Sequence, residues 1–251
     1  MGKIARPETS HWAQYWDLDP TVVFLNHGSF GACPRDILQV QRTHRAQMES
    51  EPVRFFVREL PGLMDQARLA LADFVGAAPD SLALIPNATT GVNAVLRSYA
   101  FEPGDEILIF DHVYNAVRNA ADFVAKRTGA RVKTVPIPFP IEGPEVVVER
   151  VLSAVTSRTV LAVLDHITSP TGLVMPMEEL VPRLRDRGVE TLVDGAHAPG
   201  QLDLRLDDLG AAYYVGNCHK WMCTPKGAAL LYVRSDLTEG VRPAIISHGA
   251  N

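Results

Sequence analysis

Lys220 is the residue of this sequence best placed to act as a nucleophile. It follows an apolar run, in Gly216-Asn217-Cys218-His219-Lys220-Trp221, and its neighbours are aromatic and thiol side chains rather than other charges. A lysine in partly apolar surroundings has a lowered pKa, and attack on a carbonyl carbon requires the neutral amine. Most lysines are solvated surface charges, so the segment alone is weak evidence for a catalytic group.

Asp194 ends another apolar run, 26 positions before Lys220. An acid at the end of a buried strand costs free energy unless it is paired. A structural salt bridge would satisfy it, and so would the protonated ring nitrogen of a cofactor. Both partners stay open at this point.

Two further polar segments follow apolar runs. Residues 86–93 (Pro-Asn-Ala-Thr-Thr-Gly-Val-Asn) lie between a strand candidate and a helix candidate, where backbone N–H groups and the Thr89 hydroxyl could bind an anion. Ordinary N-capping by Thr89 or Thr90 explains the same residues. Residues 165–172 (Asp-His-Ile-Thr-Ser-Pro-Thr-Gly) form a polar segment that a Ser-, Pro- and Gly-rich turn explains equally well.

The elements that must position these residues are buried strands alternating with amphipathic helices. Strand candidates cover residues 81–85, 106–110, 132–137, 160–166, 190–193, 212–215 and 228–233. They lack polar alternation, as expected for strands covered by helices on both faces. We therefore predict an α/β fold, a mostly parallel sheet sandwiched by helices. Ligands of such sheets bind beyond the carboxyl ends of the strands, where the four polar segments fall.

Two apolar stripes at helical spacing predict helices that pack on this sheet. One consists of Leu63, Ala67, Ala70, Leu71 and Phe74, and the other of Val113, Val117, Ala120, Ala121 and Val124. Residues 36–60 are charged and helix-prone, with Pro52 breaking the stretch. No closing helix follows the last strand, so we expect a C-terminal small domain to be missing from this chain.

The ordered set of motifs resembles the class V aminotransferase-like branch of fold-type I pyridoxal-phosphate enzymes, and within it the isopenicillin N epimerase-like and cysteine lyase-like subgroup. The matching motifs are residues 24–31, 52–56, 87–91, 111–114, 194–200 and 219–221. The resemblance covers residues 21–251 as a cofactor-binding large domain, incomplete at its C-terminus. Residues 1–20 are an N-terminal segment outside it.

The resemblance implies pyridoxal 5'-phosphate as the cofactor and Lys220 as its Schiff-base lysine. It implies that Asp194 pairs with the pyridinium nitrogen, which keeps the ring an electron sink. It further implies cofactor contacts for Ala88, Thr89, His112, Ser169, His197, Asn217 and His219. Within that set His112 corresponds to a stacking residue, although Tyr114 could compete for the same face of the ring. Asn26, His27, Arg54 and Tyr114 belong to motifs on the substrate side.

For the activity, the resemblance implies chemistry at the Cα of an amino acid: epimerisation, C–S elimination or transamination. Relatives bind the substrate carboxylate with an arginine of the small domain, which would lie beyond Asn251. They also form homodimers whose dimer loop would fall near residues 247–249. Cys218 and Cys223 lie too close to Lys220 for a loop nucleophile, so we interpret them as structural thiols.

Two alternatives remain. Asp165, His166, Asp194, His197 and His219 all follow strands and could bind the metal ion of a hydrolase, although no HExxH or paired CxxC motif supports this. The chain could also be a truncated, non-catalytic domain.

Composition narrows the choice of partners and compartment. With 24 Lys+Arg against 29 Asp+Glu, no basic excess favours nucleic acid. Apolar runs are too short to span a membrane, and three cysteines imply no disulfide framework. We therefore expect a cytoplasmic protein with a small-molecule substrate.

Overall fold

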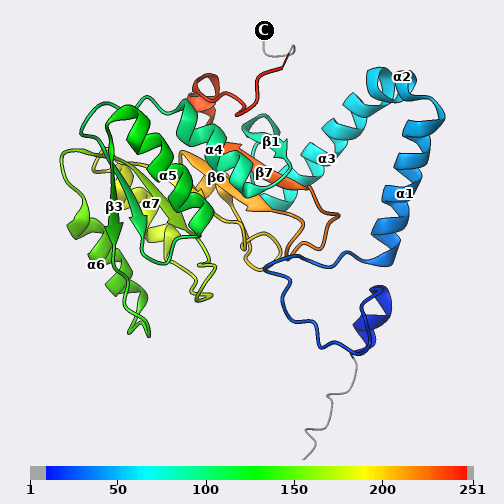
Figure 1. Ribbon diagram of the computed structural model, residues 1–251, viewed down its shortest axis with the longest axis horizontal. Coiled ribbons are helices and arrows are strands. Elements are labelled where there is room, and N and C mark those ends of the chain that lie inside the picture. The colour runs from blue at the N-terminus through cyan, green and yellow to red at the C-terminus, as the bar shows by residue number, and fades with distance from the viewer. Residues whose placement is uncertain (1–9, 248–251) are drawn as a thin grey trace, which may run out of the picture.

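A seven-stranded sheet with helices on both faces forms the body of the protein in the computed structural model, which describes residues 10–247 (Figure 1). The strands are β1 (Leu82–Ile85), β2 (Glu106–Phe110), β3 (Arg131–Val135), β4 (Thr159–Asp165), β5 (Glu190–Asp194), β6 (Tyr213–Asn217) and β7 (Ala229–Val233). Each predicted strand is present, with ends shifted by no more than two residues.

The strand order is β1-β7-β6-β5-β4-β2-β3. The strands from β3 to β6 are parallel, whereas β7 runs antiparallel to both of its neighbours, β6 and β1. Only residues 218–228 connect β6 to β7. Because a parallel pair needs a crossover of a dozen or more residues, this short connection requires the antiparallel direction. The sheet is thus mostly parallel, as predicted.

Helices alternate with the strands along the chain. They are α1 (Arg35–Ser50), α2 (Pro52–Arg54), the π-helical turn η2 (Phe55–Glu59), α3 (Leu60–Val75), α4 (Ala88–Ser98), α5 (Asn115–Thr128), α6 (Pro144–Ala154), α7 (Met177–Arg185) and α8 (Leu206–Leu209). Three short 3₁₀ turns complete the described elements: η1 (His11–Tyr15), η3 (Pro79–Ser81) and η4 (Ser235–Gly240).

The helices divide between the two faces of the sheet. Side chains of α4 and α5 pack in one apolar cluster with Ile107 and Ile109, while α3, α6 and α7 share the other cluster with Leu108 and Phe110. Successive residues of one strand therefore enter opposite cores. This double burial is why the strand sequences are continuously apolar.

Helices α1 and α3 form an arm that extends away from the sheet, with α2 at its tip (Figure 1). Pro52 ends the long helical stretch as expected, but it also begins α2, because a proline is tolerated in the first turn of a helix. No residue of α1 is buried. Val53, Phe56 and Val57 leave more than half of their surface exposed at the tip of the arm.

Within residues 10–247, none of the helices combines the length and the apolar character needed to cross a lipid bilayer. Of the segment where the dimer loop was expected, His248 and Gly249 lie outside the described residues.

Candidate active site

A cavity of about 410 Å³ lies at the carboxyl ends of the parallel strands. It brings together residues that the sequence spreads over more than 130 positions: Ala88, Thr89, Tyr114, Ser169, Asp194, His197, Asn217, His219 and Lys220. The open edge of the sheet therefore gathers the four polar segments, as the fold class predicts.

Lys220 lies in the connection that follows β6 and is partly buried. Burial lowers the pKa of its amine below the usual value, and the negative charge of Asp194 opposes this effect. The Nζ atom is 3.1 Å from Nε2 of His197. A lysine amine with a lowered pKa spends more of its time neutral, which is the form that attacks carbonyl carbon.

His197 places its own proton toward Lys220. Burial, with the charge of Lys220 as the second cause, lowers the pKa of His197 to about 4, so the imidazole is neutral near pH 7. The indole Nε1–H of Trp221 donates to its Nδ1 at 3.3 Å. A neutral imidazole whose Nδ1 accepts carries its hydrogen on Nε2. That hydrogen faces Nζ of Lys220, so this tautomer favours the neutral amine.

Asp194 is the last residue of β5 and is 4% exposed. Its Oδ1 accepts the backbone N–H of Ala196 at 3.0 Å. Burial raises the pKa of this carboxyl, while that hydrogen bond and the charge of Lys220 act in the opposite direction. A buried acid beside a single lysine could pair with a further cationic group in the cavity.

Asp165 also lines the cavity, at the end of the neighbouring strand β4. The sequence singles out Asp165 at the start of a polar segment and as a possible metal ligand, but it does not predict that Asp165 pairs in register with Asp194. Its position at a strand end, one polar residue after an apolar run, is the signal that could have identified it.

Helix α4 presents its first turn to the cavity. The Asn87 side chain caps the helix by accepting the N–H of Thr90 at 2.8 Å, and Oδ1 of Asn217 accepts the N–H of Ala88 at 2.8 Å. Ala88 and Thr89 line the cavity. Thr89 and the positive end of the helix dipole favour an anion at this position.

His219 lines the cavity near the same helix. Its Nδ1 lies 2.8 Å from the carbonyl oxygen of Ala228, which can only accept a hydrogen bond. Nδ1 therefore carries hydrogen, and Nε2 of the neutral ring is an acceptor. Burial lowers the pKa of His219, with the Ala228 bond acting in the opposite direction. Donation from Nε2 to an anion would require the imidazolium form.

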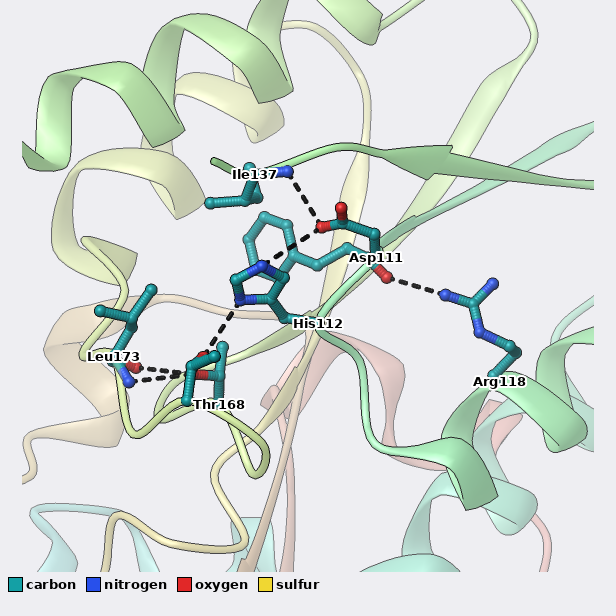
Figure 2. A network of polar contacts seen from close by, with 8 residues as sticks. Asp111, His112, Arg118, Ile137, Thr168 and Leu173 are labelled. Atoms are coloured by element: carbon teal, nitrogen blue, oxygen red, sulfur yellow. Dashed lines mark hydrogen bonds and ion pairs between the residues drawn. The ribbon is translucent and has the colours of Figure 1, made fainter. Parts of the chain in front are cut away.

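Tyr114, and not His112, lies on the cavity wall. Nδ1 of His112 is 3.1 Å from the Thr171 hydroxyl, and its Nε2 is 3.8 Å from the Asp111 carboxylate, which accepts the N–H of Ile137 (Figure 2). These contacts turn the ring toward the loop that contains Thr168 and Leu173. Of the two residues, Tyr114 lines the cavity and His112 is not among the lining residues; the stacking role of His112 stays a prediction.

Three predicted substrate-side residues lie outside the cavity lining. Asn26 bonds Ser29, and Nδ1 of His27 accepts the N–H of Ala32 at 3.3 Å. Arg54 lies in the arm and pairs with Glu59 at 2.9 Å. The motif that contains Asn26 and His27 still reaches the cavity through Gly28, Ser29 and Phe30.

Gly28 allows that loop to approach the site closely. A Cβ atom at this position would lie 3.1 Å from the His197 ring and 3.3 Å from the Trp221 ring. Gly31 is more constrained, since a side chain there would overlap the Lys220 carbonyl oxygen. Residues 28–31 therefore pack directly on the segment that carries Lys220.

The metal-site alternative lacks its ligand cluster. Among residues 10–247, no three His, Cys, Asp or Glu side chains are grouped so that they could hold a metal ion. His166 illustrates the reason. Its Nδ1 is 2.9 Å from the Tyr214 hydroxyl, and the ring lines a separate cavity with Glu178.

The cysteines near Lys220 fit the interpretation as structural thiols. Burial raises the pKa of Cys218 to about 11 and also raises the pKa of Cys223. Both thiols therefore stay protonated near neutral pH, which makes them poor nucleophiles.

Comparison with known proteins identifies the family of this arrangement. The family model described as "Aminotransferase class-V" matches residues 36–250. Isopenicillin N epimerase of Streptomyces clavuligerus is 40% identical over 230 residues, which are 92% of this chain and 58% of that protein. L-cysteine desulfhydrase of Arabidopsis thaliana is 31% identical over 243 residues, 90% of this chain and 54% of that protein.

Solved structures share the fold. The cystine C–S lyase C-DES, in complex with its reaction product cysteine persulfide, is 27% identical with a TM-score of 0.80, covering 88% of this chain and 59% of that one. A C-DES variant with glycine covalently linked to the PLP cofactor is 24% identical with a TM-score of 0.83, over 95% and 62% of the two chains. The present chain thus spans less than two thirds of the length of these relatives.

Proposed function

Because the chain belongs to the class V aminotransferase family, as the ordered motifs indicate, we propose that it binds pyridoxal 5'-phosphate and acts at the Cα of an amino acid. The observation that carries this proposal is the convergence of Lys220, Asp194 and the first turn of α4 on one cavity. An amine, a buried carboxyl and an anion-binding helix start are the three groups that an aldehyde, a pyridinium and a phosphate would each require.

The residues present fit this cofactor in charge as well as in type. Asp194 is buried, and its best available partner is a cationic ring nitrogen. The α4 terminus, with Ala88, Thr89 and Asn217, suits the phosphate. His197 and Ser169 are within the same cavity for the ring hydroxyl, and Tyr114 is the candidate to cover the ring. Residues 21–251 would form the cofactor-binding large domain.

When bound, pyridoxal phosphate supplies an electron sink that makes the Cα proton of an amino acid acidic. The Lys220 amine would hold the cofactor's aldehyde carbon and, once free, take up the Cα proton on Nζ. His197 would keep that amine neutral through its Nε2 hydrogen. Asp194 would hold the ring nitrogen protonated, and His219 would donate to the phosphate after taking up a proton on Nε2.

Borohydride reduction followed by peptide mapping tests the cofactor assignment. We expect the chain, incubated with pyridoxal phosphate, to retain a reduced adduct on the peptide that contains Lys220. Lys220→Ala should lose it, while Lys126→Ala, at an exposed lysine of α5, should keep it. An adduct that persists at full yield in Lys220→Ala contradicts the assignment.

The reaction is tested by exchange of the Cα proton in deuterated water, followed by NMR over a panel of amino acids. Epimerisation, C–S elimination and transamination all begin with loss of this proton, and their products then separate them. A chain that forms the Lys220 adduct but exchanges no amino acid would instead be the non-catalytic domain.

We also infer a homodimer and a cytoplasmic location. The exposed apolar side chains of the arm support association with a second copy. Cys33, Cys218 and Cys223 are all free thiols, which suits a reducing compartment.

A further inference from the structure

We propose that Asp165 is a positioning residue of the cavity, a carboxyl that shares one proton with Asp194 so that the two together carry a single negative charge. This inference rests on the proposed function for its purpose, because a single charge on Asp194 is what one ring cation requires. The evidence for the inference is independent of the proposed function: it is the arrangement of two acids at adjacent strand ends.

The two acids are neighbours across the sheet. Asp165 and Asp194 are register partners on the neighbouring parallel strands β4 and β5, and both line the cavity. Asp165 is 2% exposed and Asp194 is 4% exposed. Side chains at paired positions of adjacent strands point to the same face, so neither acid can turn away from the other without leaving the cavity.

Asp165 has little to stabilise a negative charge. Its Oδ1 accepts one long hydrogen bond, from the backbone N–H of Tyr114 at 3.4 Å. Its Oδ2 is fully buried and has no hydrogen-bond partner among the described residues. A carboxylate needs several donors when buried, whereas a protonated acid can donate its own hydrogen to a neighbouring carboxylate.

The charges around the pair also favour a protonated Asp165. Lys220 contributes at most one positive charge to two carboxyls, so ionisation of both would leave one buried charge uncompensated. Burial and the proximity of Asp194 hold the pKa of Asp165 well above its usual range. Two acids in one site commonly share a proton for this reason.

Other titratable groups near the strand ends do not supply a second cation. In the cofactor-free protein His197 is neutral near pH 7, as shown above, and burial lowers the pKa of His166 and of His219 too. On β6, Tyr214 is an uncharged phenol whose pKa burial raises further. Glu178, on α7, faces His166, and Asp111, after β2, faces His112. These two acids add only negative charge.

Shared protonation has a defined effect on stability. The folded chain keeps a proton on Asp165 that the unfolded chain releases above about pH 4. The folded state therefore binds more protons, and the stability of the cofactor-free protein falls as pH rises from about 4 toward the raised pKa. Asp165→Asn replaces the acid with a neutral amide of similar shape and removes this part of the pH dependence.

Melting temperatures of the cofactor-free chain test the pair without any activity. At pH 4.5 we expect Asp165→Asn to melt within about 1 °C of the parent. At pH 8 it should melt about 2–4 °C higher, because the amide folds without taking up the proton that Asp165 must bind from solution at that pH. Asp203→Asn, at an exposed carboxylate, controls for the exchange of acid for amide.

A double-mutant cycle separates pairing from burial alone. In an Asp194→Asn background the neighbouring charge is gone, so the gain from Asp165→Asn at pH 8 should shrink although burial still contributes. A gain that is the same at both pH values, or the same in both backgrounds, overturns the inference.

Failure of the proposed function would look different. Absence of a borohydride-trapped adduct on Lys220 in the parent chain contradicts the cofactor assignment. The double-mutant cycle of Asp165 and Asp194 can still be measured in that case, because it uses the cofactor-free chain. Conversely, a normal adduct combined with an uncoupled cycle contradicts only the role of Asp165.

Discussion

Two side chains, Trp221 and His197, control the proton of Lys220 at the scale of single residues. Trp221 donates to Nδ1 of His197, so the neutral imidazole carries hydrogen on Nε2 and offers it to Nζ. Trp221 follows Lys220 in the chain, which means that the segment carrying the amine also carries the group that sets its protonation. The low pKa of His197, about 4, keeps this arrangement intact over the ordinary working range of pH.

We predict that Trp221→Phe makes Lys220 less reactive at a given pH. Without the indole donor, His197 can place its hydrogen on Nδ1, and its free Nε2 then accepts from a protonated amine. One weak hydrogen bond is worth about 0.5–1.5 kcal/mol, so the pH midpoint of adduct formation should rise by about 0.5–1 unit. Borohydride trapping over a pH series measures this midpoint.

Trp16→Phe is the matched control, because Trp16 also donates through Nε1, to the Ala32 carbonyl, and neither residue lines the cavity. It should leave the midpoint unchanged. An unshifted midpoint in Trp221→Phe would show that the tautomer of His197 does not govern the amine.

Sequence reasoning found the residues that directly follow strands and was weaker where a loop decides the direction of a side chain. Asp194, Asn217 and Lys220 line one cavity, because the carboxyl ends of parallel strands lie at the same end of the sheet. His112 and Tyr114 are two positions apart in a turn, and their hydrogen-bond partners Thr171 and Asp165 are more than 50 residues away. No local pattern shows which of the two turns toward the cavity.

At the scale of elements, the start of α4 is tied to the end of β6. Oδ1 of Asn217 accepts the Ala88 N–H in a buried hydrogen bond. The proposed phosphate site and the segment that carries Lys220 therefore hold fixed positions relative to one another. The bond crosses 129 residues of sequence, so no short motif contains both ends.

We predict that Asn217→Ala lowers the free energy of unfolding by about 1–3 kcal/mol, since it leaves a buried N–H without an acceptor. Urea unfolding measures the loss. The variant should also bind pyridoxal phosphate more weakly, because the helix start is no longer held against β6.

Asn87→Ala gives the comparison. It removes the N-cap of the same helix, at a cost of about 0.5–2 kcal/mol, without touching the link to β6. If Asn217→Ala and Asn87→Ala weakened cofactor binding equally, fraying of the helix rather than its attachment to β6 would be the cause.

The extent of the strands was predictable because the central strands β2, β4, β5, β6 and β7 are buried almost throughout and bounded by polar residues. The directions and the order of the strands were harder to predict from the sequence. Nothing in the residues of β7 distinguishes it from a parallel strand, and its antiparallel direction follows only from the short connection after β6. The π-helical turn Phe55–Glu59 has no sequence signal in the patterns used, because a helix with one wider turn keeps nearly the same apolar spacing.

At the scale of the whole molecule, the arm formed by α1, α2 and α3 projects away from the sheet (Figure 1). Its tip exposes Val53, Phe56 and Val57, and α1 buries no residue. A group of exposed apolar side chains on a projecting element is typical of an interface. This is the surface on which the proposed homodimer is most directly testable.

We predict that Phe56→Ser combined with Val53→Ser weakens self-association by at least tenfold in dissociation constant, which corresponds to about 1.4 kcal/mol. Sedimentation over a concentration series measures it. Phe123→Ser, at an exposed phenylalanine of α5, should leave association unchanged. A chain that sediments as a monomer at every concentration would contradict the homodimer itself.

The place of β7 in the sheet also determines when β1 can pair during synthesis on the ribosome. β1 (Leu82–Ile85) pairs with β7 (Ala229–Val233) and with no other strand in the described part of the chain. At a translation rate of about 5–20 residues per second, β1 waits roughly 7–30 s after its own synthesis before its partner exists. During that interval the nascent chain displays an open β-edge next to the start of α4. A chaperone that recognises extended apolar segments would therefore meet residues 82–85 before any cofactor could be bound.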